Sequence, residues 1–257
     1  MAVLVDIGNT RIKWASLERG RLVDRGSVVH RDSLATAIAA FDAALPAKPR
    51  IIASNVAGVD VAERLEALVA GRPGASLELV ATSAERFGVR CAYADPSRLG
   101  VDRWVAVLAA HHAQRARAAA CVLNAGTAVT FDAVDSGGAH LGGLILPGAS
   151  LLAAALDRHT SKIGRTAPAT SVPRGLDLLG RNTDAAVGHG AWLALGAALD
   201  RAVATVASAL GATPVVYLTG GDADALQGWL ETRVELRADL VLEGLALFAS
   251  ARAEAGR

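Results

Sequence analysis

Residues 3–15 read VLVDIGNTRIKWA. The apolar run at residues 3–5 is typical of a buried strand, and the alternation of apolar and polar residues at 11–15 predicts a second strand. The polar residues between them then form the turn of a β-hairpin. The chain is therefore expected to open with two antiparallel strands.

The turn of this hairpin carries the residue types of a phosphate site. Gly8 can take positive φ and lets a ligand approach the backbone, while backbone N–H groups of such a turn can point at an anion. Asp6 could hold a hydrated Mg²⁺, and Lys13 could meet a phosphate as a point charge. We expect a phosphate-binding hairpin for a nucleotide. The alternative is an ordinary hairpin in which Asp6 accepts turn hydrogen bonds.

Length and composition set the broad class. The 257 residues allow one large or two small domains, and the net charge of +1 gives no indication of nucleic acid or an anionic membrane as a partner. No apolar stretch is expected to span a membrane, since Val187–Leu199 is too short. Cys91 and Cys121 have no metal-binding spacing, and no signal peptide is expected before the first strand, so a reducing cytoplasm is predicted.

The patterns after the hairpin predict an α/β domain. A third strand is expected at 21–30, then a helix to about 45, a strand at 50–54, a helix at 59–69 and a strand at 77–80. Three antiparallel strands followed by helix, strand, helix and strand are the layout of a mixed sheet.

A second candidate site lies in residues 93–104, which read YADPSRLGVDRW. A turn around Pro96 leads into a helix expected to reach about Ala120. Asp102 near its start could act as a general base, and Arg103 could bind a substrate anion. The alternative is an acid placed there by the helix dipole alone.

The chain then repeats its opening design. Residues 120–134 read ACVLNAGTAVTFDAV, which again predicts a strand, a Gly/Thr turn and an alternating strand. Residues 139–145 correspond to the third strand of the first copy. Such duplication predicts two copies of one α/β unit that face each other across a cleft, with a nucleotide triphosphate gripped by both hairpins. We expect an N-terminal domain at 1–118 and a C-terminal domain at 119–257.

Four further elements are expected in the second copy. Pro147 opens a helix, and residues 184–210 form a long helix. A strand at 214–219 runs into Gly220 and Gly221, which either pass near a base or ribose or form an ordinary β–α turn. A helix over 239–253 closes the chain.

Six blocks in order make the chain similar to the type III pantothenate kinases: DIGNTRIKW, YADPSRLGVDRW, LNAGTAVTFD, GGLILPG, GRNTDAAVGHG and LTGGDA. The resemblance covers the chain almost end to end. It implies the sugar kinase, heat-shock protein and actin superfamily, with two ribonuclease-H-like (actin-like ATPase) domains, mixed sheets and a central cleft. It also implies transfer of the γ-phosphate of ATP to the 4′-hydroxyl of pantothenate, the first step towards coenzyme A.

The resemblance implies a role for each motif residue. Asp102 would take the hydroxyl proton, and Asp6 would position Mg²⁺. Residues implied to bind ATP and its phosphates are Asp6, Ile7, Gly8, Asn9, Thr10, Arg11, Ile12, Lys13, Thr127, Gly220 and Gly221. Residues implied to bind pantothenate are Tyr93, Gly100, Val101, Asp102, Arg103 and Thr183, with Arg103 pairing with its carboxylate.

One residue departs from the family pattern. Members carry Asp where this chain has Asn124, and that Asp helps to bind a monovalent cation, K⁺ or NH₄⁺. Asn keeps an oxygen ligand without the charge, so we expect weaker or altered cation dependence. The resemblance also implies a cytoplasmic homodimer.

Two other functions stay open at this point. One is a regulatory protein on the same fold, acting as an accessory factor in transcription. Such a role would tolerate loss of Asp6 or Asp102, and because both are present the enzyme is favoured. The other is a kinase or phosphatase of the same superfamily with another small substrate. A P-loop enzyme lacks support because GxxxxGK[ST] does not occur in the sequence, and no Cys/His pattern supports zinc.

Overall fold

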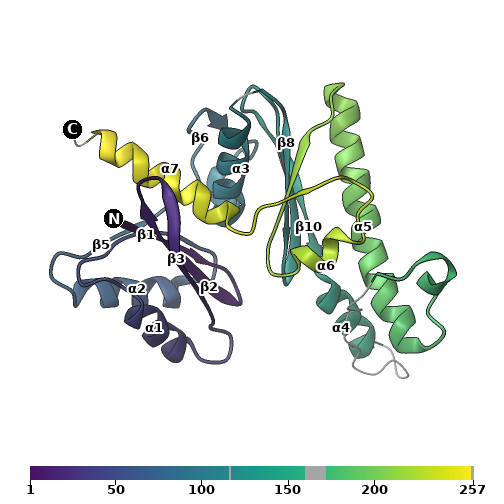
Figure 1. Ribbon diagram of the computed structural model, residues 1–257, viewed down its shortest axis with the longest axis horizontal. Helices are drawn as coiled ribbons and strands as arrows, with labels where there is room; N and C mark the ends of the chain where they lie inside the picture. The colour runs from purple at the N-terminus through teal and green to yellow at the C-terminus, as the bar shows by residue number, and fades with distance from the viewer. Residues whose placement is uncertain (116, 160–171, 256–257) are drawn as a thin grey trace. The chain divides into compact units, whose positions relative to one another are not determined.

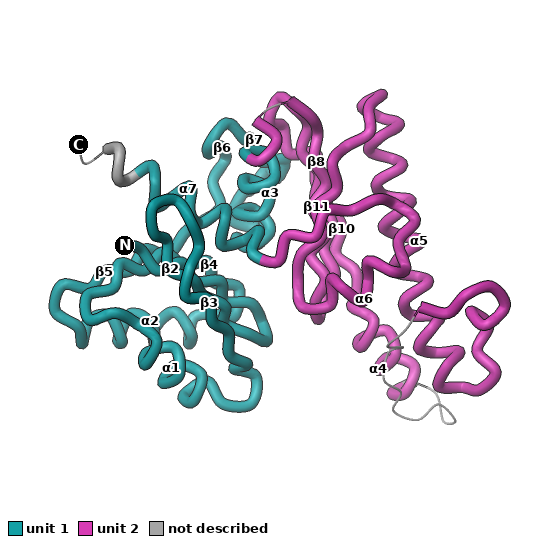
Figure 2. The backbone as a smooth tube through the Cα atoms, viewed as in Figure 1, with its two compact units in different colours: residues 1–112, 239–257 teal, residues 113–238 magenta. Residues whose placement is uncertain are grey.

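The computed structural model of the chain describes residues 1–115, 117–159 and 172–255 (Figure 1). They form two compact units, residues 1–112 with 239–257 and residues 113–238 (Figure 2). The domain boundary predicted from the sequence, after residue 118, placed the C-terminal helix in the second domain. The compact units differ from it because that helix, α7 (Leu240–Ala255), packs against the first sheet.

The first unit is built on a mixed five-stranded sheet. Its strands lie in the order β3 (Arg21–Val29), β2 (Arg11–Glu18), β1 (Ala2–Ile7), β4 (Arg50–Asn55) and β5 (Ser76–Leu79). β1, β2 and β3 pair antiparallel, whereas β1, β4 and β5 run parallel. Helices α1 (Leu34–Ala43) and α2 (Val59–Ala70) cover one face and α7 lies on the other (Figure 1). The predicted order of strands and helices is confirmed.

Strand alternation determines what each face of this sheet carries. Because successive side chains of a strand point to opposite faces, alternate residues of β1 enter the core under α1 and α2. That core includes Val3, Val5, Ile7, Ile12, Phe41 and Leu65. Asp6, between two core residues, therefore points to the opposite face.

Four elements follow the first sheet in sequence and lead to the second unit. β6 (Glu85–Arg86) and β7 (Val89–Arg90) form a small hairpin that the sequence patterns did not predict. The 3₁₀ turn η1 (Pro96–Arg98) precedes α3 (Val101–Gln114). The prediction that this helix reaches about Ala120 is wrong: Arg115 adopts a left-handed φ of 50°, which ends the helix before the next strand.

The second unit repeats the first sheet. Its strands lie in the order β10 (His140–Pro147), β9 (Ala128–Val134), β8 (Ala120–Ala125), β11 (Val215–Thr219) and β12 (Glu235–Leu236). The first three pair antiparallel, and β8, β11 and β12 run parallel, as in the first unit. The predicted duplication of a ribonuclease-H-like unit is confirmed. A helix was expected to open at Pro147, but Pro147 is the last residue of β10, paired with Ala128.

Helices cover one face of the second sheet. They are α4 (Ala149–His159), α5 (Thr183–Leu210) and α6 (Ala223–Gln227), with the 3₁₀ turn η2 (Gly175–Leu178) before α5. Side chains of α5 and the strands share one core, which includes Leu123, Phe131, Trp192, Leu195 and Leu218. Asn182 caps α5 by accepting the Ala185 N–H at 2.8 Å.

Within the described residues, α5 is the one helix long and apolar enough, by length and composition, to cross a membrane. The expectation from sequence rested on its central run alone, 187–199, which is too short. One face of α5 packs into the core of the second unit. The helix also carries the charged residues Asp184, Asp200 and Arg201.

Candidate active site

Asp6 stands in a row of polar residues across three strands of the first unit. It pairs directly with Lys13 on β2 and with Ser54 on β4. Paired residues on neighbouring strands lie on the same face, so the three side chains share the face away from α1 and α2. The buried Ser54 hydroxyl donates a hydrogen bond to Asp6 Oδ1 at 2.9 Å.

Burial changes the ionisation of Asp6. Loss of solvent raises its pKa from the ordinary 3.8 to about 6, and the charge of Asp102 acts in the same direction. The Ser54 hydrogen bond and the Lys13 ammonium act in the opposite direction. Asp6 and Asp102, which come from β1 and α3, are thus two interacting carboxyl groups of one unit. A carboxyl group whose pKa is raised by burial and by a second charge, as that of Asp6 is, is typical of a functional site.

The hairpin turn after Asp6 is closed by backbone hydrogen bonds. The Gly8 N–H donates to the Arg11 carbonyl at 3.1 Å, and the Val56 N–H donates to the Ile7 carbonyl at 3.0 Å. Gly8 does not use the positive φ that glycine allows, and a Cβ there would make an ordinary contact of 3.6 Å with the Arg11 carbonyl. What Gly8 provides is a backbone without a side chain beside the turn.

The other turn residues divide into two groups. The Ile7 and Ile12 side chains are fully buried in the core, so they could meet a ligand through their backbone alone. Asn9 and Arg11 are exposed, and Thr10 and Lys13 are half-buried. The Arg11 guanidinium donates to Ser27 Oγ at 3.0 Å.

Asp102 and Arg103 begin α3. Asp102 Oδ1 accepts the Arg103 N–H at 2.8 Å. A Cβ on Gly100 would lie only 2.8 Å from that same oxygen, so glycine leaves room for the carboxylate. The buried Arg103 guanidinium donates to the Tyr93 hydroxyl at 3.3 Å. Val101, which lies between Gly100 and Asp102 in sequence, is half-buried.

The second unit holds the counterpart of the Asp6 row. Asn124 is the penultimate residue of β8, as Asp6 is of β1, and it pairs with Thr130 on β9 and Thr219 on β11. Amide and hydroxyl groups therefore stand where the first unit has a carboxyl, an ammonium and a hydroxyl. Thr127, in the turn that follows, is exposed.

Gly220 and Gly221 differ in what requires them. Gly220 has φ +104°, and a Cβ there would lie 2.0 Å from the Ala125 carbonyl oxygen, so packing against β8 demands glycine. A Cβ on Gly221 would have no neighbour within 4 Å, so the backbone there is open. The Asp222 N–H donates to the Ala125 carbonyl at 3.0 Å, and burial raises the pKa of the Asp222 carboxyl.

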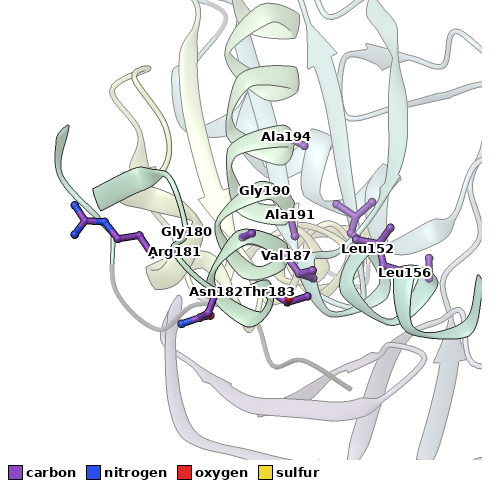
Figure 3. Close-up of a pocket in the computed structure, with 12 residues that line it drawn as sticks. Leu152, Leu156, Gly180, Arg181, Asn182, Thr183, Val187, Gly190, Ala191 and Ala194 are labelled. Atoms are coloured by element: carbon purple, nitrogen blue, oxygen red, sulfur yellow. The ribbon is translucent and has the colours of Figure 1, made fainter. Parts of the chain in front are cut away.

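Thr183 begins α5 and is one of the residues that line an open, mainly apolar pocket of about 810 Å³. Leu152 and Leu156 of α4 line it opposite Val187 and Ala191 of α5 (Figure 3). The pocket belongs entirely to the second unit.

The predicted residues divide between the two compact units. Asp6, Lys13, Gly100, Asp102 and Arg103 belong to the first unit. Thr127, Thr183, Asn124, Gly220 and Gly221 belong to the second. Sequence reasoning did not single out Ser54, which donates to Asp6, or His30, whose ring donates to the Gly8 carbonyl at 2.7 Å. The position of Ser54 at the end of a predicted parallel strand could have revealed it, whereas His30 gives no local signal.

The donor sets fit the expected cations. No group of three or more His, Cys, Asp or Glu side chains within the described ranges could hold a metal. Mg²⁺ does not need one, because it is commonly held by one or two carboxylates with substrate phosphates. Asp6 fits, since a cation would offset the cost of ionising its desolvated carboxyl. Asn124, Thr130 and Thr219 offer neutral oxygens suited to a monovalent cation.

Comparisons with known proteins identify the family. The chain matches the family model of the type III pantothenate kinases over residues 2–205. It is 35% identical over 250 residues to the type III pantothenate kinase of Nitrosococcus oceani, covering 96% of this chain and 92% of that protein. It is 36% identical over 253 residues to that of Aromatoleum aromaticum, covering 97% and 98%.

A solved structure supports the fold. A Campylobacter jejuni protein whose name places it in the Baf family of transcriptional activators superposes with a TM-score of 0.60 at 18% identity, covering 98% of this chain and 99% of that one. At that identity the likeness shows the fold alone. The matches in sequence carry the assignment: this chain belongs to the type III pantothenate kinase family.

Proposed function

We propose that this chain transfers the γ-phosphate of ATP to the 4′-hydroxyl of pantothenate, the first step of coenzyme A biosynthesis. Family membership supports the reaction. The observation that carries the assignment of roles is the pair of interacting carboxyl groups, Asp6 on β1 and Asp102 on α3, in one unit.

Asp102 acts as the general base in this proposal. It accepts the proton of the 4′-hydroxyl while that oxygen forms a bond to the γ-phosphorus. The bond from the γ-phosphorus to the bridging oxygen breaks, and ADP leaves with the electron pair. Most of the catalysis is positioning and charge neutralisation.

The first hairpin holds the triphosphate. The backbone of residues 7–12 and the Lys13 ammonium face the phosphates, with the exposed Asn9 and Arg11 beside them. Asp6 would hold Mg²⁺, which supplies neutralisation of phosphate charge when bound. Thr127 contributes from the second hairpin, and Gly220 and Gly221 border the adenosine.

Arg103 recognises the pantothenate carboxylate. Its guanidinium is buried and held by Tyr93, so its charge acts in a site of reduced dielectric where an anion is bound strongly. Gly100, Val101 and Thr183 complete the pantothenate contacts. A monovalent cation at Asn124, a homodimer and a cytoplasmic location belong to the same proposal.

The first experiment measures ADP release on addition of pantothenate, with Mg²⁺ and K⁺ or NH₄⁺. Wild type is compared with Asp102→Asn and with Asp24→Asn, a control that neutralises an exposed Asp on β3 whose positive φ Asn tolerates. We expect wild type and Asp24→Asn to turn over and Asp102→Asn to lose roughly 10²–10⁴-fold in kcat.

Each other result has a definite meaning. Turnover that survives in Asp102→Asn keeps the kinase and removes Asp102 from the role of base. Failure of wild type to use pantothenate with any cation contradicts the proposed substrate.

A further inference from the structure

His30 lies directly after β3 and contacts the turn of the first hairpin twice. Its backbone N–H donates to the Thr10 carbonyl at 3.0 Å, and its ring Nε2 donates to the Gly8 carbonyl at 2.7 Å. The residue is 9% exposed. A single residue from outside the hairpin therefore fixes carbonyls at both ends of the three-residue turn 8–10.

The duplicated unit separates the two contacts of His30. Gly148 directly follows β10 as His30 follows β3, and its N–H donates to the Thr127 carbonyl at 2.9 Å. The backbone contact thus recurs in both copies of the fold. Gly148 has no side chain, and a Cβ there would lie 2.3 Å from the Gly126 carbonyl oxygen. The hydrogen bond from the His30 ring to the Gly8 carbonyl therefore has no counterpart at Gly148 in the second hairpin.

The ring contact determines where the next amide points. A trans peptide is planar, and its C=O and N–H bonds point in opposite directions. Because the Gly8 carbonyl is turned onto His30, the Asn9 N–H of the same peptide points away from His30. The Ile7 carbonyl is likewise occupied, by the Val56 N–H. The carbonyl oxygens of Ile7, Gly8 and Thr10, which would repel a phosphate, are therefore bonded to protein donors.

We propose that His30 is a positioning residue for the nucleotide: its imidazole holds the Gly8–Asn9 peptide so that the turn presents the Asn9 N–H, and not the Gly8 carbonyl oxygen, to the triphosphate. This inference rests on the proposed function, because it assigns the first hairpin to ATP. His30 touches the hairpin and not the reacting atoms, so it acts on nucleotide affinity more than on the chemical step.

The test compares His30→Gln with His30→Met. The two side chains have similar length and flexibility, and the Gln amide can donate to the Gly8 carbonyl whereas the Met thioether cannot. The dissociation constants of ADP and of a non-hydrolysable ATP analogue are measured by calorimetry with Mg²⁺, together with KM for pantothenate, kcat and the melting temperature. His112→Leu removes an exposed histidine on α3 and serves as the control.

We expect His30→Met to weaken nucleotide binding by roughly tenfold, as loss of one ordering hydrogen bond does. In His30→Gln the dissociation constant of the nucleotide stays within about threefold of the wild-type value. KM for pantothenate stays unchanged in both variants. Should His30→Met fail to fold, His30→Asn, which is polar but one bond shorter than Gln, takes its place and shows the same loss.

Two results overturn the inference while the proposed function stands. One is a dissociation constant for the nucleotide in His30→Met that lies within twofold of the value for an active wild type. The other is equal weakening of nucleotide and pantothenate in His30→Met and His30→Gln, which marks His30 as part of the fold only. A wild type that binds no nucleotide and phosphorylates no pantothenate instead contradicts the proposed function, whatever the variants do.

Discussion

Ser54 and Asp6 occupy directly paired positions on the parallel strands β4 and β1, and the Ser54 hydroxyl donates to the Asp6 carboxylate at 2.9 Å. This hydrogen bond lowers the pKa of a carboxyl that burial raises to about 6. The neighbouring strand therefore favours the ionised form of Asp6, the form in which it can hold a cation.

Removing the Ser54 hydroxyl is expected to move the acid limb of the activity profile. Ser54→Ala takes away the hydrogen bond that lowers the pKa of Asp6, so that pKa rises further and Asp6 ionises at higher pH. The pH dependence of kcat/KM for ATP measures the shift. Ser250→Ala, which removes an exposed hydroxyl bonded within α7, is the control. An acid limb at the same pH in both variants would contradict this role of Ser54.

Asp6→Asn is expected to stabilise the fold while abolishing activity. The folded-state pKa of Asp6 lies above its ordinary 3.8, so the protonated form is favoured on folding. That stability is fully present below pH 3.8 and is lost as pH rises through about 6. Asn removes the cost of ionisation, which is at most about 3 kcal/mol. Urea unfolding should show a larger gain at pH 7.5 than at pH 4; an equal gain at both would contradict the raised pKa.

Gly100→Ala is expected to lower kcat with little change in stability. The added Cβ would lie 2.8 Å from Asp102 Oδ1, and the carboxylate, as the end of a side chain, can move aside. A misplaced base costs roughly tenfold to a hundredfold in rate. Steady-state kinetics and thermal melting separate the two effects. Gly71→Ala, where a Cβ makes contacts of 3.6 Å or more, is the matched control and should keep its activity.

Gly220→Ala is expected to destabilise the second unit. The substitution combines φ +104° with a Cβ only 2.0 Å from the Ala125 carbonyl oxygen. We expect a loss of about 2 kcal/mol or more in the free energy of unfolding. Gly221→Ala, with open space around its Cβ, should change that free energy by less than about 1 kcal/mol. Equal losses in both variants would show that the close approach of Gly220 to β8 is not the cause.

Asn124→Asp is expected to strengthen the dependence on monovalent cation. A carboxylate would add a charge beside Thr130 and Thr219, where the chain now offers neutral oxygens. Rates measured across K⁺ concentrations should show half-saturation at lower K⁺ in the variant than in the wild type. An unchanged response would remove Asn124 from the cation site.

Local pattern was enough to predict most strands and the duplication. The repeated strand–turn–strand design around Asp6 and Asn124 correctly indicated two copies of one unit, each built on a mixed sheet. The pairing of Asp6 with Lys13 is likewise local, because a hairpin fixes its own register. Two-residue strands such as β6, β7 and β12 are too short to show a period, and they were missed.

The remaining errors concern contacts between distant parts of the chain. Ser54 contacts Asp6 although 48 residues of sequence separate them. The hydrophobic periodicity of the sequence does not predict the register in which two parallel strands pair. α7 was assigned to the second half because it follows it in sequence, yet it packs on the first sheet. The end of α3 depends on the left-handed backbone of Arg115, a residue type that carries no turn signal.

The return of α7 to the first unit bears on the order of synthesis. Residues 113–238 are contiguous and leave the ribosome as a complete unit, whereas the first unit lacks α7 until residues 240–255 have been made. Domains fold as units during synthesis, so the unit made second can be the first to finish. The sheet that carries Asp6, although translated first, gains its covering helix last. The nascent chain therefore holds no complete first unit until residues 240–255 have been made.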